Sequence, residues 1–178
     1  MEYPTMKLMF ENENPISVFE VGCANGGLLK DITLKYPNIE VGGLDTNLSD
    51  LVRAKSLFPK YTENFILGDI RYTEIPKHYN IIFTCGTLMM IATNILPLIE
   101  KMRKSSRAVF IAEMHDDIQD EWGTNTDLVE GDIKLSKDSD NGSTINTRIT
   151  RNYKKVFEKL GIPFEHLGHV AGKDIFKI

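Results

Sequence analysis

Short apolar runs alternate with amphipathic stretches along most of the chain. Apolar runs of about four to eight residues are typical of buried strands, and apolar positions spaced three and four apart are typical of helices. The first expected strand ends at Glu20, and the others span 39–44, 64–67, 79–84, 108–113, 164–170 and 174–178. The expected helices span 27–35, 49–58, 92–102 and 152–160, the third with an interior proline, Pro97. This alternation indicates a mainly parallel sheet with helices on both faces.

One long stretch does not follow the alternation. Residues 116–147 are polar, contain three glycines and hold the only tryptophan, Trp122. A segment of this length without periodicity is usually an active-site cover or an insertion. Because 178 residues suffice for one such domain and leave no room for a second, we expect residues 1–178 to form a single domain. In it, 116–147 and the N-terminal segment 1–15 would cover the substrate.

A glycine-rich turn follows the first strand. It reads Glu20-Val21-Gly22-Cys23-Ala24-Asn25-Gly26-Gly27 and opens the first helix. Glycine admits positive φ and lets backbone N–H groups approach a ligand, so the turn predicts a nucleotide-type cradle. Taken alone, the residues also fit the dinucleotide fingerprint, as Gly22-x-Ala24-x-x-Gly27, or an ordinary strand-to-helix turn.

Two acidic residues follow the next two strands. Asp45 lies about 20 residues beyond the turn. A carboxylate at this position can accept hydrogen bonds from both ribose hydroxyls of a nucleotide-type cofactor. Asp69 follows the third strand in the sequence Gly68-Asp69-Ile70.

Taken in order, these signals resemble class I S-adenosylmethionine-dependent methyltransferases. That family has an acid and then Gly-x-Gly-x-Gly, where this chain has Ala24 for the middle glycine, and its chain closes with a helix and a hairpin, as residues 152–178 do. The resemblance implies a Rossmann-like, doubly wound, mainly parallel seven-stranded sheet with a C-terminal antiparallel hairpin. It also implies S-adenosylmethionine as cofactor, with Asp69 accepting from the adenine amino group and Ile70 covering the ring. The residues implied to bind the cofactor are Glu20, Gly22, Cys23, Ala24, Asn25, Gly26, Asp45, Thr46, Gly68, Asp69, Ile70, Thr84, Cys85 and Gly86.

The resemblance implies methyl transfer to a small-molecule hydroxyl or amine. The strand end 83–88 and the run 111–113 most resemble small methyltransferases of sugar biosynthesis, and no Asp-Pro-Pro-Tyr or Asn-Pro-Pro-Tyr sequence points to bases or glutamine. His115 directly follows the fifth strand and is the preferred general base, with Glu113 and Asp116 as alternates. One alternative is a non-catalytic, cofactor-binding subunit or degenerate homologue that acts through a partner. A nicotinamide-dependent oxidoreductase is less favoured, because no Tyr-x-x-x-Lys pair follows the fourth strand.

Charge and composition limit the kinds of partner and location that the sequence predicts. The net charge of −4 disfavours a nucleic-acid-binding surface, and no apolar run approaches the ~20 residues of a membrane span. No secretory signal is visible at the N-terminus, so a cytoplasmic location is expected. Cys23 and Cys85 are expected as small, semi-buried residues beside the cofactor. His166 and His169 should face opposite sides of a strand, so we expect no metal site; the pattern gives no oligomeric state.

Overall fold

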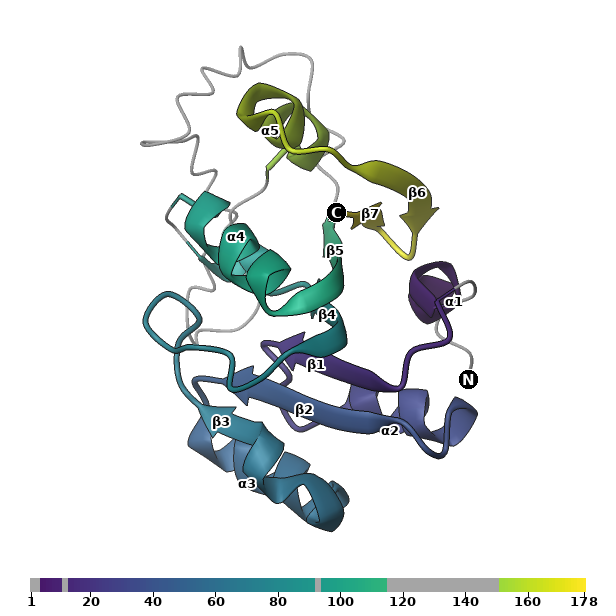
Figure 1. Cartoon of the computed structure of the whole chain (residues 1–178), viewed down its shortest axis with the longest axis vertical. Coiled ribbons are helices and arrows are strands. Elements are labelled where there is room, and N and C mark those ends of the chain that lie inside the picture. The colour runs from purple at the N-terminus through teal and green to yellow at the C-terminus, as the bar shows by residue number, and fades with distance from the viewer. Residues whose placement is uncertain (1–3, 11–12, 92–93, 115–150) are drawn as a thin grey trace, which may run out of the picture.

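The computed structural model describes residues 4–10, 13–91, 94–114 and 151–178, which form one seven-stranded sheet (Figure 1). The strand order is β3-β2-β1-β4-β5-β7-β6. Strands β1 to β5 run parallel, and β7 is antiparallel to both of its neighbours, β5 and β6. The strands are β1 Ser17–Val21, β2 Glu40–Asp45, β3 Phe65–Leu67, β4 Tyr79–Cys85, β5 Ser106–Met114, β6 Glu165–Val170 and β7 Lys173–Lys177. The predicted parallel sheet with a C-terminal antiparallel hairpin is confirmed.

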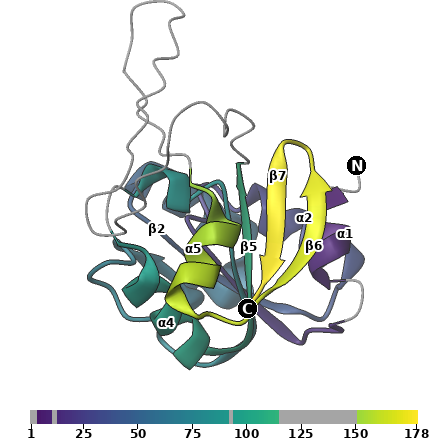
Figure 2. The ribbon, with the colours of Figure 1, turned by 90° about the horizontal axis from the view of Figure 1, so that it is seen from above.

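Helices cover both faces of the sheet (Figure 2). The pleat sends alternate residues to opposite faces, and in β1 Val18 belongs to one hydrophobic cluster while Phe19 belongs to the other. The cluster of Val18 also takes side chains from α1, α2 and α3, and that of Phe19 takes them from α4 and α5. The helices are α1 Pro4–Phe10, α2 Gly27–Lys35, α3 Leu48–Leu57, α4 Leu96–Lys104 and α5 Tyr153–Leu160, with 3-10 turns η1 Pro59–Asn64 and η2 Leu88–Met90.

Local sequence explains where the helices begin and end. The Asn47 side chain accepts from two backbone N–H groups at the start of α3, and Gly161 ends α5 with a φ of 63°. The expected helix 92–102 was wrong at its start, because α4 begins at Leu96. Pro97 thereby falls in the first turn, where its missing N–H costs no hydrogen bond.

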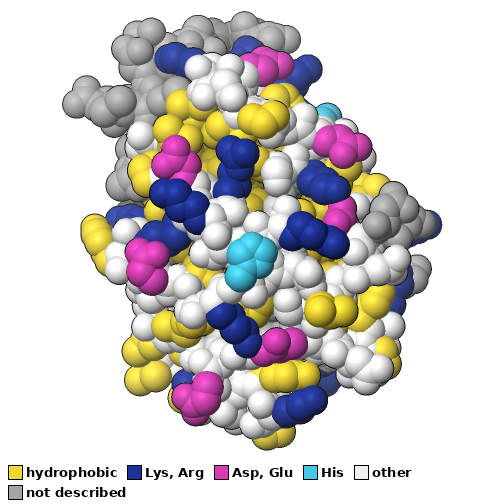
Figure 3. Space-filling model, in the orientation of Figure 1, with side chains coloured by type: hydrophobic (Ala, Val, Ile, Leu, Met, Phe, Trp, Pro, Cys, Tyr) yellow, Lys and Arg dark blue, Asp and Glu magenta, His cyan; other side chains and the backbone are white. Residues whose placement is uncertain are grey.

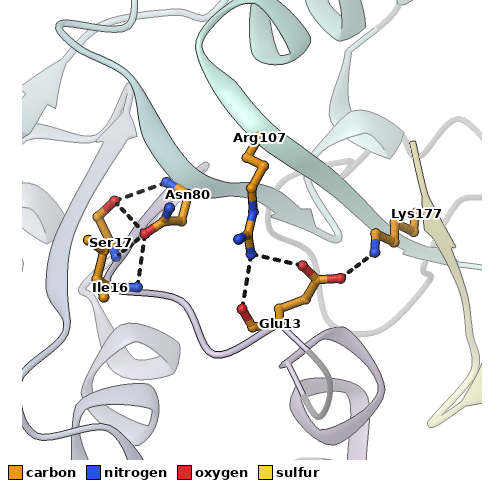
Figure 4. A network of polar contacts seen from close by, with 6 residues as sticks. All are labelled: Glu13, Ile16, Ser17, Asn80, Arg107 and Lys177. Atoms are coloured by element: carbon orange, nitrogen blue, oxygen red, sulfur yellow. Dashed lines mark hydrogen bonds and ion pairs between the residues drawn. The ribbon is translucent and has the colours of Figure 1, made fainter.

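The N-terminal segment belongs to the core, which the sequence pattern did not predict. Met9 and Phe10 of α1 are fully buried, and the Phe10 ring lies edge-on to Phe83 at 5.9 Å. Figure 4 shows that Arg107 of β5 and Lys177 of β7, two neighbouring strands of the sheet, both contact Glu13. The described part of segment 1–15 therefore stabilises one face of the sheet, and a role in covering the substrate stays a prediction.

On the face of the molecule drawn in Figure 3, basic and acidic side chains are interspersed. Among the helices that the structure describes, none is long and apolar enough to cross a membrane.

Candidate functional site

The loop after β1 turns tightly into α2. Gly22 and Gly26 have φ angles of 78° and 77°, which glycine adopts without steric cost. Ala24, between them, has a φ of 43°. In this left-handed conformation the Cβ atom lies close to the following carbonyl oxygen, which costs a residue other than glycine about 1–2 kcal/mol. Positions 22, 24 and 26 therefore all adopt positive φ, although the middle residue is alanine.

Most N–H groups of this loop are used within the protein. The N–H groups of Gly22 and Cys23 donate to the carbonyl of Leu44 at 2.7 and 3.1 Å. The N–H of Ala24 donates to Asp45 Oδ2 at 2.7 Å. The expectation that these donors face a ligand was therefore wrong, because the end of β2 already accepts them. What the loop offers a ligand is a close backbone surface.

Gly22 is also the point where the loops after β1 and β4 meet. A Cβ atom at Gly22 would lie 2.2 Å from Thr87 Oγ1, closer than any side chain allows. The Thr87 hydroxyl donates to the carbonyl of Val21 at 3.0 Å. The missing side chain thus serves the packing of the protein itself and fixes the two loops relative to each other.

Asp45 lies half-buried at the carboxyl end of β2. Its Oδ2 accepts from Ala24, and its Oδ1 accepts from the N–H of Asn47 at 2.8 Å. Each carboxylate oxygen has two lone pairs, so each can take a second hydrogen bond. The side chain fits a pair of ribose hydroxyls. Its neighbour Thr46 is exposed.

Asp69, after β3, is bound to a neighbouring cation. It accepts from the backbone N–H of Arg71 at 2.9 Å and from its guanidinium, which holds the pKa of Asp69 below its usual value. The carboxylate stays an ionised acceptor, as the adenine role requires. Gly68 packs tightly, since a Cβ there would lie 2.3 Å from Thr73 Oγ1. Ile70 is only 3 % exposed, so its contact with an adenine ring stays a prediction.

Glu20 is a buried acid at the end of β1. It pairs with Gly43, two residues before Asp45, so both acids point to the same face of the sheet. Its Oε2 is buried without a hydrogen-bond partner in the described structure. Burial, and then the charge of Asp45, raise the pKa of Glu20 to about 8, although Lys173 acts in the opposite direction. An unpartnered buried oxygen at this edge fits a hydrogen-bond donor of a ligand.

Glu113, at the end of β5, holds the turn that follows β4. Its Oε1 accepts from the N–H groups of Thr87 and Leu88, both at 3.0 Å, and its Oε2 accepts from Met89 at 3.2 Å. The side chain is fully buried, and burial raises its pKa against these hydrogen bonds. These contacts favour a structural role over that of an alternate base. His115 and Asp116 lie outside the described residues.

Comparisons with known proteins give structural matches alone. A scan against protein-family models and a search of curated sequences both find no match. The N-terminal domain of EvdMO1, solved with S-adenosylhomocysteine (SAH) bound, has a TM-score of 0.71 at 13 % identity, over 99 % of this chain and 81 % of that chain. The methyltransferase SibL, in its apo form, has a TM-score of 0.68 at 11 % identity, over 99 % of this chain and 53 % of that one.

The plantazolicin methyltransferase BpumL, in complex with SAH, has a TM-score of 0.52 at 22 % identity and covers 62 % of this chain. This chain spans 45 % of the BpumL chain. Together with the antiparallel β7 between β5 and β6, the matches decide the architecture. The chain has the class I methyltransferase fold.

In this methyltransferase fold the two cysteines differ in position. The Cys23 side chain points under β2, where a Cβ at Gly43 would lie 2.6 Å from Cys23 Sγ, and burial raises the pKa of its thiol. Cys85 lies half-buried at the end of β4, beside Gly86, whose φ is 73°. Cys85 is therefore the more exposed of the two thiols, and the place of both beside a cofactor stays a prediction.

Lys173, at the start of β7, is the residue at this edge that the sequence pattern did not reveal. Its Nζ lies 3.4 Å from Cys85 Sγ. A lone lysine in a terminal hairpin carries no motif, and only the pairing of Lys173 with Met114 at the end of β5 brings it here. The sequence predicted the C-terminal hairpin, but not that its second strand pairs with β5.

The expectation that His166 and His169 face opposite sides of β6 was wrong. The pairing of β6 with β7 shifts between His166 and Gly168, and such a bulge breaks the alternation of the pleat. Both rings therefore lie beside Asp174 Oδ1, at 3.3 and 3.2 Å. Within the described ranges, no group of three His, Cys, Asp or Glu side chains is arranged to hold a metal ion.

Proposed function

We propose that this chain is an S-adenosylmethionine-dependent methyltransferase that acts on a small molecule. The observation that carries the proposal is the placement of three acids, Glu20, Asp45 and Asp69, at the carboxyl ends of the adjacent strands β1, β2 and β3. Ligands of open α/β sheets bind at this edge. The SAH bound to the EvdMO1 domain and to BpumL supports the choice of cofactor.

Each acid has a proposed part in holding the cofactor. Asp45 would accept from the ribose hydroxyls and Asp69 from the adenine amino group. The loop 22–26 and the strand end 84–86 would border the methionine moiety. The cofactor, when bound, supplies a methyl group on a positively charged sulfur, and the protein contributes alignment and exclusion of water.

The proton-accepting step rests on residues after β5. His115 is the proposed general base and Asp116 its alternate, because both directly follow the strand on the ligand edge. The contacts of Glu113 with Thr87, Leu88 and Met89 argue for a supporting role instead. The cover formed by 116–147, with Trp122 against the acceptor, stays a prediction outside the described residues, as does the sugar acceptor.

The alternatives differ in how the fold bears on them. Dinucleotide-binding sheets have the order 3-2-1-4-5-6, whereas here an antiparallel β7 lies between β5 and β6. That difference argues against the nicotinamide-dependent oxidoreductase. A non-catalytic subunit would have the same fold and cofactor site, so it stays the second candidate.

Calorimetry tests the cofactor. SAH should bind and NAD should not. Asp45→Ala should weaken SAH binding by about 10- to 150-fold, the cost of a charge-assisted hydrogen bond, and Glu63→Ala, at an exposed position of η1, is the control. Unchanged affinity in folded Asp45→Ala would remove Asp45 from the site. A second experiment separates the methyltransferase from the non-catalytic subunit. The protein is incubated with S-adenosylmethionine and a panel of metabolites, and the formation of SAH is measured. Binding of the cofactor without formation of SAH favours the non-catalytic subunit.

A further inference from the structure

Lys173 reaches over the ligand edge from the antiparallel strand. Its partner Met114 ends β5, and its side chain extends back to the end of β4, where Nζ contacts Cys85 Sγ at 3.4 Å. A Cβ atom at Gly86 would lie 3.8 Å from Lys173 Cε and 4.0 Å from Nζ. The ammonium therefore lies beside the loop after β4, which is proposed to border the methionine moiety.

Three other cations among the described residues near this edge already have acceptors. Arg71 is paired with Asp69, Arg151 donates to the carbonyls of Leu88 and Ile91, and Lys101 donates to those of Ile70 and Thr73 at 3.0 Å. These side chains hold loops together.

Lys173 has no such oxygen acceptor among the residues that the structure describes. In the described part of the chain its one hydrogen bond is to the Cys85 thiol, and no carboxylate lies within ion-pair distance. Burial raises the pKa of Cys85, so the thiol is neutral and a weak acceptor. An ammonium has three donors, and two of those of Lys173 have no acceptor within the described ranges.

The surroundings select the kind of anion. Glu20 and Asp45 lie on the same face of the sheet. Cys85 is paired with Ala112, and Ala112 is paired with Ile175, two residues beyond Lys173. Lys173 and Cys85 therefore lie on one face of the sheet as well. The negative charge of Asp45 on that face opposes a dianion such as phosphate more strongly than a monoanion, whereas Glu20, with a pKa of about 8, is largely protonated at neutral pH. A carboxylate also forms short, charge-assisted bonds with an ammonium. Next to a sulfonium, an uncompensated ammonium would be repelled, and a carboxylate between the two positive charges removes that repulsion.

We propose that Lys173 is an anion-binding residue of the ligand edge and that it binds a ligand carboxylate. The carboxylate belongs either to the methionine moiety of the cofactor or to the methyl acceptor. The inference rests on the proposed function, and it adds to it a residue from β7 and a charge requirement.

Two compounds related to the cofactor test whether the carboxylate is that of its methionine moiety. Calorimetry compares SAH, which has the carboxylate, with 5′-methylthioadenosine, which lacks the amino-acid part. If the carboxylate is that of the cofactor, Lys173→Met weakens SAH binding by about 10- to 100-fold, leaves 5′-methylthioadenosine unchanged, and is largely rescued by Lys173→Arg. Lys104→Met, an exposed lysine in α4, is the charge-matched control.

Carboxylic acids and their neutral amide isosteres test whether the carboxylate is that of the methyl acceptor. Saturation-transfer magnetic resonance compares propionate and benzoate with propionamide and benzamide on the SAH complex. If the acceptor supplies the carboxylate, the two acids bind, the two amides do not, and Lys173→Met abolishes the difference while SAH affinity stays unchanged.

The contrary results are equally defined. Equal weakening of SAH and 5′-methylthioadenosine in Lys173→Met, or unchanged SAH affinity together with no acid binding that depends on Lys173, would overturn the proposal. Failure of the proposed function is separate, since wild-type protein would then bind neither nucleoside. Lysine-dependent binding of benzoate by the protein alone would still support an anion site at Lys173 in that case.

Discussion

Ala24 stands where the Gly-x-Gly-x-Gly pattern has its middle glycine. Its φ of 43° is left-handed and strains the backbone of an alanine. Ala24→Gly should raise the free energy of unfolding by about 0.5–1 kcal/mol, because relief of left-handed strain exceeds the added entropy of the unfolded chain. Urea denaturation measures the difference. Ala54→Gly, in the middle of α3, is the control and should lower stability by about 1 kcal/mol or more. A destabilised Ala24→Gly variant would mean that the methyl group makes a contact more valuable than the strain it causes.

Glu20 should make stability depend on pH. Its pKa is raised from 4.5 to about 8, chiefly by burial, so between these values the folded chain binds the proton more tightly than the unfolded chain. The contribution of Glu20 to stability is therefore full below pH 4.5 and is lost as pH rises toward 8, at up to about 1.4 kcal/mol per pH unit. Denaturation of Glu20→Gln across this range should show a flatter profile than that of wild type. Parallel profiles would indicate that water or a shifted side chain already stabilises the charged carboxylate.

At the scale of elements, β5 and the turn η2 are joined through one carboxylate. Glu113→Ala should lower the free energy of unfolding by about 2–4 kcal/mol, because buried N–H groups at Leu88 and Met89 lose their acceptor. Glu113→Gln keeps one oxygen acceptor and should lose less. Chemical denaturation gives both values. A Glu113→Gln variant with full stability and SAH affinity but no turnover would restore the general-base hypothesis.

How well the sequence predicts an element depends on where its determinants lie. Helix α2 has the predicted bounds, because the apolar stripe and the Gly26 turn lie within a few residues of each other. Helix α1 was not predicted, because only contact with Phe83 and other residues far along the chain makes its seven residues helical.

The site divides in the same way. Glu20, Asp45 and Asp69 follow strands and are visible as strand ends, whereas Lys173 and the paired histidines depend on strand pairing and on a bulge. Neither feature leaves a local pattern. Even the strand-end acids have contacts that the sequence does not show, such as the Arg71 guanidinium on Asp69.

At the scale of the whole molecule, the two edges of the sheet have separate tasks. The carboxyl edge brings together the loops after β1, β2, β3 and β4, with Lys173 of β7. The amino edge carries the polar contacts drawn in Figure 4, where Asn80 accepts from the N–H groups of Ile16 and Ser17 at 2.9 and 3.1 Å. These contacts fix the chain as it enters β1.

The separation predicts that the amino edge can be weakened without loss of ligand binding. Glu13→Ala removes the carboxylate that Arg107 contacts at 3.0 Å and that Lys177 also binds. Stability should fall by about 1–3 kcal/mol, with faster hydrogen exchange in α1. SAH affinity should stay within twofold, because the described side-chain contacts of Glu13, with Arg107 and Lys177, lie at the amino edge. The control is Glu158→Ala, at an exposed position of α5. If Glu13→Ala weakens SAH binding as strongly as Asp45→Ala does, the N-terminal segment takes part in the site, and its predicted role in covering the ligand gains direct support.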